Sequence, residues 1–219
     1  MKLAPAAALL LLFSLPLQAA CPTWSGEFRQ GALVWASVAP GSRVTLNEEA
    51  LSVAEDGTVV MGFDRDAPPT AALRIDGPQP CEQELAVLLR DYRIQRVDGV
   101  PRRTVEPDPA DLERIRREAA LVRQARASSS GLTDFLVGFQ WPLEGPISGV
   151  YGSQRVYNGK PGRPHYGVDV AAPAGTPVAA PAPGVVVLAE PDLFFSGGTL
   201  IIDHGSKVSS SFLHLSKVT

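Results

Sequence analysis

The sequence has few of the residues and motifs on which many enzymes depend. Its 219 residues include only two cysteines and three histidines. The phosphate-binding patterns G-x-x-x-x-G-K-[ST] and G-x-G-x-x-G and the serine elbow G-x-S-x-G are absent from it, which argues against nucleotide binding and serine nucleophiles. Its 20 basic and 23 acidic residues are mixed along the chain, and without a basic stripe no nucleic-acid partner is expected.

Residues 1–20 are expected to form a secretory signal peptide. Lys2 supplies a positive charge, "AAALLLLFSLPL" is a short apolar run, and the small residues "QAA" precede Cys21. The apolar run is too short to span a bilayer, and no later segment is apolar enough to do so. We therefore expect the mature chain to be exported, periplasmic or extracellular, with no transmembrane segment.

The two cysteines, Cys21 and Cys81, are expected to form a disulfide, because two cysteines in an exported chain usually pair. Such a bond closes a loop of about 60 residues, for which the chain-entropy model gives roughly 4 kcal/mol of stabilisation. The alternative is a lipid anchor on Cys21. However, Gln18 stands where a lipid-attachment signal usually has an aliphatic residue, and lipidation would leave Cys81 alone.

The composition, with 20 Gly and 20 Pro, favours short strands and many turns. Residues 21–95 are expected to form a small β-sandwich-like domain. Asp56-Gly57 is its clearest hairpin signal, and Val59, Met61 and Phe63 alternate after it. Nothing in this domain resembles a chemical site, so it is interpreted as a spacer or binding module.

Residues 96–138 are expected to be a linker that contains one helix at about 109–127. Asp108 is a natural N-cap with Pro109 at the first helical position. The apolar face is expected to hold Leu112, Ile115, Ala119 and Val122, and Arg114–Glu118 is an expected i,i+4 ion pair. The helix would link or buttress two domains.

Residues 139–219 are rich in Gly, Pro, Val and Ala and show no helical periodicity. We therefore expect an all-β segment, which makes the whole chain mainly β. The candidate strands are short: "GPISGVYG", "HYGVDVAA", "TPVAAPAPGVVVLAE", "GTLIIDHG" and "VSSSFLHLS".

His165 and Asp169 are the candidate metal ligands. In an extended strand, residues i, i+2 and i+4 share a face, so His165, Gly167 and Asp169 would point the same way. Gly167 has no side chain and would leave room for a metal ion between the two ligands. A surface histidine near an aspartate has the same spacing, so the pattern alone does not prove a metal site.

The other two histidines have different expected roles. In "SFLHLS", Leu213 and Leu215 are expected to face the core while His214 faces the open side. There His214 could act as a general acid or base, orient a water near a metal, or be an ordinary half-exposed residue. His204, at the end of a strand, is expected to make structural hydrogen bonds. Of the available chemistries, metal-assisted hydrolysis has the most support.

Four stretches in this order resemble the M23 family of zinc metallopeptidases, the lysostaphin and LytM type of peptidoglycan endopeptidase. They are "ISGVYGSQR", "HYGVDVAAPAGTPVAAPAPGVVV", "GGTLIIDHG" and "SSFLHLS", within residues 139–219. The resemblance implies zinc bound by His165 and Asp169, with His214 lining the active site near a zinc-bound water. The implied partners are peptidoglycan stem peptides, whose cross-links a metalloendopeptidase would hydrolyse.

The family's third zinc ligand lies in a His-x-His motif beyond the "HLS" stretch, and the 219 residues contain no such motif. We therefore expect an incomplete, C-terminally truncated LytM-type domain that binds zinc weakly and has little activity. One alternative is a degenerate, non-catalytic module that binds cell wall or activates a separate hydrolase. A purely structural protein would leave the ordered motifs unexplained. Histidine and aspartate also accept other divalent metals, so zinc rests on the resemblance.

Overall fold

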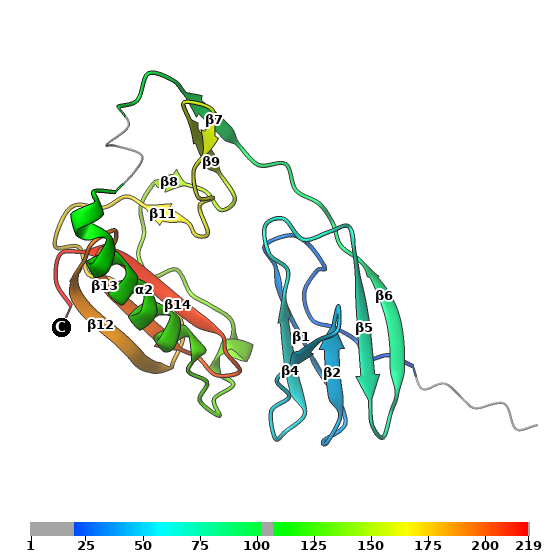
Figure 1. Cartoon of the computed structure of the whole chain (residues 1–219). Coiled ribbons are helices and arrows are strands. Elements are labelled where there is room, and N and C mark those ends of the chain that lie inside the picture. Colours follow the sequence, from blue (N-terminus) through cyan, green and yellow to red (C-terminus); the bar gives the residue numbers. More distant parts are fainter. Residues whose placement is uncertain (1–19, 102–106, 219) are drawn as a thin grey trace, which may run out of the picture.

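The computed structural model describes residues 20–101 and 107–218, so the predicted signal peptide lies, apart from Ala20, outside the described residues. It contains two β-rich halves, and the chain passes from one to the other between β6 and β7 (Figure 1). The mainly β fold class is confirmed. No helix in the described ranges is long and apolar enough to cross a membrane.

The elements follow one another in this order: β1 (Leu33–Ser37), β2 (Arg43–Leu46), β3 (Glu49–Leu51), β4 (Thr58–Gly62), β5 (Thr70–Asp76), β6 (Cys81–Ala86), β7 (Ile94–Val97), η1 (Pro109–Asp111), α2 (Leu112–Ala127), η2 (Asp134–Val137), β8 (Ile147–Gly149), β9 (Gln154–Tyr157), β10 (Lys160–Pro161), β11 (Asp169–Val170), β12 (Val185–Leu193), β13 (Gly197–Asp203) and β14 (Ser209–Leu215).

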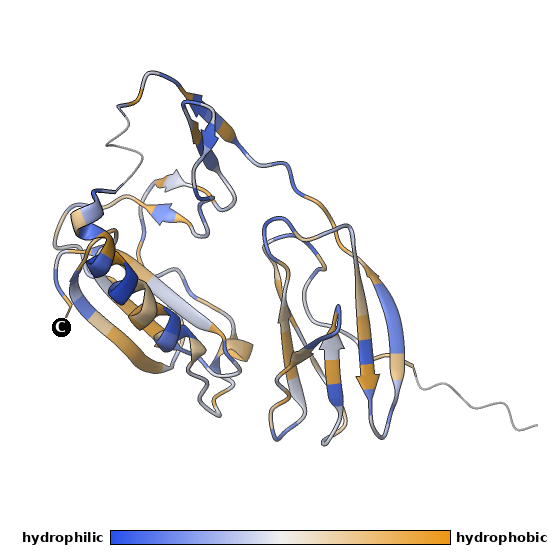
Figure 2. Ribbon diagram, in the orientation of Figure 1, coloured by the Kyte–Doolittle hydropathy of each residue, from blue (hydrophilic) through white to orange (hydrophobic). Residues whose placement is uncertain are grey.

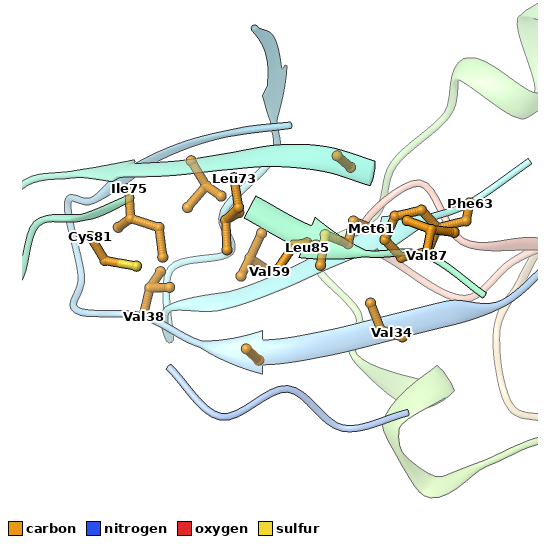
Figure 3. Packing of buried hydrophobic residues seen from close by; sticks show 13 residues of the cluster. Val34, Val38, Val59, Met61, Phe63, Leu73, Ile75, Cys81, Leu85 and Val87 are labelled. Atoms are coloured by element: carbon orange, nitrogen blue, oxygen red, sulfur yellow. The ribbon is translucent and has the colours of Figure 1, made fainter. Parts of the chain in front are cut away.

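The N-terminal domain is a small sandwich of a two-stranded sheet, β1–β4, and a four-stranded sheet in the order β3–β2–β5–β6. Buried and exposed residues alternate along β5, as expected for a strand with one face on the core. Figure 3 shows the apolar side chains that gather between the sheets. They include Val34, Val38, Val59, Met61, Phe63, Leu73, Ile75, Cys81, Leu85 and Val87.

The Asp56-Gly57 turn forms as the sequence indicates. Gly57 has a φ of +86°, and a Cβ there would overlap the carbonyl oxygen of Val38. The Asp56 carboxylate accepts a 2.8 Å hydrogen bond from the Thr58 amide, an Asx-type contact that stabilises the turn. This hydrogen bond lowers the pKa of Asp56.

The structure pairs Cys21 with Cys81, whose Cα atoms are 5.3 Å apart. Cys81 begins β6 and belongs to the buried core cluster. The bond therefore fastens the start of the described chain to an edge strand of the sandwich.

The linker is helical from residue 109 to 127, as a 3₁₀ turn followed by α2. The Asp108 carboxylate caps it by accepting a 2.9 Å hydrogen bond from the Ala110 amide. One residue expected on its apolar face is wrong: Ala119 is exposed, and Glu118 is half-buried in its place. Glu118 and Ala119 are three and four residues after Ile115, so either can lie on the same stripe of the helix. Hydrogen bonds to the Glu118 carboxylate favour Glu118 at this place.

Helix α2 lies across the antiparallel sheet β12–β13–β14 (Figure 1). Hydrophilic and hydrophobic residues alternate along its visible side, and much of β12 is hydrophobic (Figure 2). After the helix, the Ser130 amide donates a 2.7 Å hydrogen bond to the buried Asp203 carboxylate at the end of β13. The chain after α2 is thus held against the sheet.

Strand β7 leaves the N-terminal domain and pairs in parallel with β9, which pairs in turn with β10. The boundary expected at residue 95 therefore falls inside a strand that joins the two halves. Strands β9 and β10 are connected by Asn158-Gly159, both with positive φ, a turn signal that our sequence analysis did not use.

The alternation expected for β14 is wrong in part. Leu213 is 48% exposed, whereas Phe212 is half-buried. The pairing of β14 with β13 shifts register between Gly198 and Leu200, and His214 has a φ of +60°. A bulge of this kind interrupts the two-residue period of a strand.

Candidate metal site

His165 and Asp169 meet at the surface of the C-terminal half. The His165 Nε2 atom lies 3.0 Å from Asp169 Oδ1, and the two side chains are 34% and 57% exposed. The strand expected to hold both residues is shorter than predicted, because β11 begins only at Asp169 and Gly167 lies in a bend. The two side chains are nevertheless brought together.

The orientation of the His165 ring is fixed by a backbone carbonyl. Its Nδ1 atom lies 3.2 Å from the Val150 oxygen and its Nε2 atom lies 3.0 Å from Asp169 Oδ1, and both oxygens can only accept hydrogen bonds. A neutral imidazole has one N–H, so it can donate to one of these oxygens while its other nitrogen faces an acceptor with a lone pair. A proton or a metal ion between Nε2 and Asp169 Oδ1 would remove the repulsion between the nitrogen lone pair and the carboxylate oxygen. In metal sites, a ligand histidine usually donates its other N–H to a carbonyl or a carboxylate, as Nδ1–H would to Val150.

Two glycines leave space around the pair. A Cβ built on Gly149 would overlap the Asp169 carboxylate, which packs directly on that glycine. A Cβ on Gly167 would lie 4.0 Å from His165 Nε2. Gly149 was not among the predicted site residues, although a glycine inside a strand is a signal for close approach.

The described residues supply two protein ligands for a metal and not three. Across residues 20–101 and 107–218, no three His, Cys, Asp or Glu side chains are grouped so that they could hold a metal ion. Since a catalytic zinc normally has three protein ligands, His165 and Asp169 fit part of such a site. His214 is exposed near the end of β14, where its amide donates a 2.8 Å hydrogen bond to the Ser196 oxygen. Its place beside a zinc-bound water stays a prediction.

His204 is fully buried, and both of its ring nitrogens have partners. Nδ1 lies 2.6 Å from the Pro183 carbonyl and Nε2 lies 2.9 Å from the Ser210 hydroxyl. The ring also makes an edge-to-face contact with Phe139, with centroids 5.2 Å apart. These contacts tie the segment before β12 to β13 and β14, which is the kind of role that the sequence suggested for His204.

The segment 150–154, a turn that leads into the first residue of β9, holds the backbone of His165 and is called the 150–154 loop. The Gly152 amide donates a 2.7 Å hydrogen bond to the His165 oxygen, and the His165 amide donates a 2.8 Å bond to the Ser153 oxygen. The same loop provides the Val150 carbonyl that faces Nδ1. Both the backbone and the ring of His165 therefore depend on where this loop lies.

Comparison with known proteins finds a family match for the part of the chain that contains these residues. Residues 163–219 match the model of peptidase family M23. This segment, called the M23 segment below, is therefore similar to peptidase family M23. This M23 segment contains His165, Asp169, His204 and His214.

A similar solved structure extends the likeness beyond the M23 segment. It is a crystal structure of a Pseudomonas aeruginosa protein named as a candidate M23 peptidase. The two chains share 28% sequence identity with a TM-score of 0.64, over 88% of this chain and 76% of the other. No curated protein matches the chain. The family and this neighbour support a peptidase function.

Proposed function

We propose that the protein is a zinc-dependent endopeptidase that hydrolyses peptide cross-links of bacterial peptidoglycan outside the cytoplasm. The observation that carries this proposal is the His165–Asp169 pair, in which Nε2 faces a carboxylate oxygen while Nδ1 faces a carbonyl. The match of the M23 segment to a peptidase family supports the reaction class. The Cys21–Cys81 disulfide fits an exported protein.

His165 and Asp169 would hold the zinc, and both are exposed enough for a peptide to reach them. When bound, zinc supplies a Lewis acid and lowers the pKa of a bound water toward neutrality. The Val150 carbonyl would then hold the imidazole by its Nδ1–H, and Gly149 leaves the space that the Asp169 carboxylate occupies. His214 is proposed to exchange a proton with the reacting groups or to orient water.

Zinc titration of the 219-residue chain tests the assignment of the ligands. With two ligands, the chain is expected to bind zinc weakly but measurably by calorimetry. His165→Ala and Asp169→Asn should each weaken binding by more than the about 10–100-fold that is typical for loss of an outer-shell partner. His214→Ala keeps both ligands and should bind zinc as the unchanged chain does. Equal affinity of the unchanged chain and His165→Ala would rule out the proposed ligand pair.

A non-catalytic cell-wall binding module is the second candidate, favoured by the two-ligand site in the described residues. Incubation with purified peptidoglycan, with and without a chelator, separates the two functions. An endopeptidase releases new amino groups only without the chelator. A binding module sediments with peptidoglycan under both conditions and releases none.

A further inference from the structure

We propose that the N-terminal domain positions His165, and that Arg65 is the residue through which it acts. Arg65 follows β4 and reaches from the N-terminal domain to the 150–154 loop. The effect on metal binding rests on the function proposed above, whereas the effect on the loop does not.

Arg65 is a buried arginine with contacts both inside its own domain and in the C-terminal half. It is 8% exposed, and its Nε–H donates a 2.7 Å hydrogen bond to the Gly152 oxygen. A second nitrogen lies 3.5 Å from the Gln154 side-chain oxygen. The guanidinium also stacks 4.6 Å from the centroid of the Tyr92 ring, a cation–π contact. A third nitrogen pairs with Asp66 at 2.6 Å.

Aromatic rings pack this junction closely. Tyr92 contacts Tyr151 edge to face at 6.3 Å, and Tyr151 contacts Tyr166 at 6.4 Å. Tyr166 directly follows His165 in the chain. A Cβ on Gly31 would overlap the Tyr151 ring, and one on Gly152 would overlap the Tyr92 ring. Burial raises the pKa of Tyr151, which accords with a junction that is poorly hydrated.

The contacts form a short path from Arg65 to the metal-binding side chain. Arg65 holds the Gly152 carbonyl, and the Gly152 amide holds the His165 carbonyl. Two residues earlier, the Val150 carbonyl faces the imidazole Nδ1. Arg65 touches neither the imidazole nor a substrate, so it is a positioning residue.

The sandwich itself does not depend on this side chain. The buried apolar cluster of the N-terminal domain consists of residues other than Arg65, and that cluster supplies the main free energy of burial. Removing the guanidinium should therefore loosen the 150–154 loop while the two sheets stay folded.

Amide hydrogen exchange of the full chain, resolved to single amides by NMR, tests the role of Arg65 without a metal. In Arg65→Ala, the Gly152 and His165 amides should exchange at least about tenfold faster, because a hydrogen bond from a charged donor stabilises by about 1.5–3 kcal/mol. Amides of β5 and β13 should be unchanged. Arg74→Ala removes an exposed arginine of the same domain, paired with Asp76 and Glu82, and should exchange as the unchanged chain does.

A second pair of variants isolates the ring on which the guanidinium stacks. Tyr92→Ala should reproduce the faster exchange. Tyr92→Phe should not, because the buried Tyr92 hydroxyl has no hydrogen-bond partner among the described residues. Zinc affinity should be weaker in Arg65→Ala and Tyr92→Ala and unchanged in Tyr92→Phe. The loss in Arg65→Ala should be about tenfold, as for loss of an outer-shell partner.

The outcomes separate the two proposals. Unchanged exchange at Gly152 and His165 in Arg65→Ala overturns the positioning role. Faster exchange throughout β5 and β13 also overturns it, because Arg65 would then support the whole fold. If the unchanged chain and His165→Ala bind zinc equally poorly, the metal assignment fails, while hydrogen exchange still decides the role of Arg65.

Discussion

At the scale of single residues, a glycine shapes the candidate metal site together with the two proposed ligands. Gly149 ends β8, and its Cα faces the Asp169 carboxylate across the β8–β11 pairing. Any other residue would place a Cβ where a carboxylate oxygen lies. The position of Asp169 thus depends on the absence of a side chain on the neighbouring strand.

Gly149→Ala should displace the Asp169 carboxylate and weaken zinc binding at least about tenfold, comparable to losing a residue that orients a ligand. The melting temperature should change little, because the Asp169 side chain is mostly exposed and can turn toward solvent. Zinc titration and thermal melting measure the two effects. Gly131→Ala is the matched control, since a Cβ at Gly131 meets nothing within 4 Å. Unaltered zinc affinity in Gly149→Ala would contradict the assigned geometry.

The sequence predicted that His165 and Asp169 lie together, but not what surrounds them. The spacing of His165 and Asp169 was sufficient, because four residues of chain can bring two side chains together in several backbone conformations. The Val150 carbonyl and Gly149 come from 15 and 20 residues before the ligand that each one contacts. Their roles depend on tertiary contacts, which local periodicity does not encode.

At the scale of elements, the half-buried Glu118 carboxylate attaches α2 to the β12–β13 hairpin. Glu118 Oε2 accepts a 2.6 Å hydrogen bond from the Phe194 amide, and Oε1 accepts one from Arg114. Arg114 also bonds the Asp192 oxygen at 2.7 Å. Burial raises the pKa of Glu118, but these hydrogen bonds outweigh it, so the pKa lies below the ordinary 4.5.

The lowered pKa predicts a loss of stability in acid. A carboxylate with a depressed folded pKa stabilises fully above its unfolded pKa, here near 4.5, and the stabilisation disappears as the pH falls through the folded pKa. The melting temperature of the unchanged chain should therefore fall more steeply than that of Glu118→Gln between about pH 6 and about pH 3. Glu113→Gln, at an exposed position of the same helix, should keep the steep fall. Parallel curves for the unchanged chain and Glu118→Gln would refute the attachment.

Elements were predictable where the signal was local. The Asp108 cap and the Asp56-Gly57 turn each depend on hydrogen bonds between close neighbours in the chain. The exposure of Ala119 was not predictable, because only the Phe194 amide, far along the chain, makes Glu118 the better residue for that face. The pairing of β7 with β9 likewise joins segments about 60 residues apart.

At the scale of the whole molecule, the two halves are stabilised by separate means. The sandwich has its own apolar cluster and the Cys21–Cys81 bond. The C-terminal half depends on contacts among α2, the β12–β14 sheet and the buried His204. A change confined to one half should therefore be measurable apart from the other.

Reduction of the disulfide should lower the free energy of unfolding of the sandwich by roughly 4 kcal/mol, as expected for an open loop of about 60 residues. Amides of β5 should then exchange faster while those of β13 keep their protection. Hydrogen exchange with and without reductant measures this difference. The same reductant should have no effect on a Cys21→Ala/Cys81→Ala double variant. Equal acceleration in β5 and β13 would show that the halves unfold as one unit.

The parallel pairing of β7 with β9 also determines how the protein can be divided. Because β7 precedes the linker helix in the chain yet lies in a sheet of the other half, no single cut between β7 and that helix separates the two halves. A protease that cleaves near residue 100 would leave two polypeptides still hydrogen-bonded through this strand. In the same way, any hinge between the halves would lie before β7, in residues 89–93, because Leu88 is still hydrogen-bonded to Phe28 and Gln30 of the N-terminal domain.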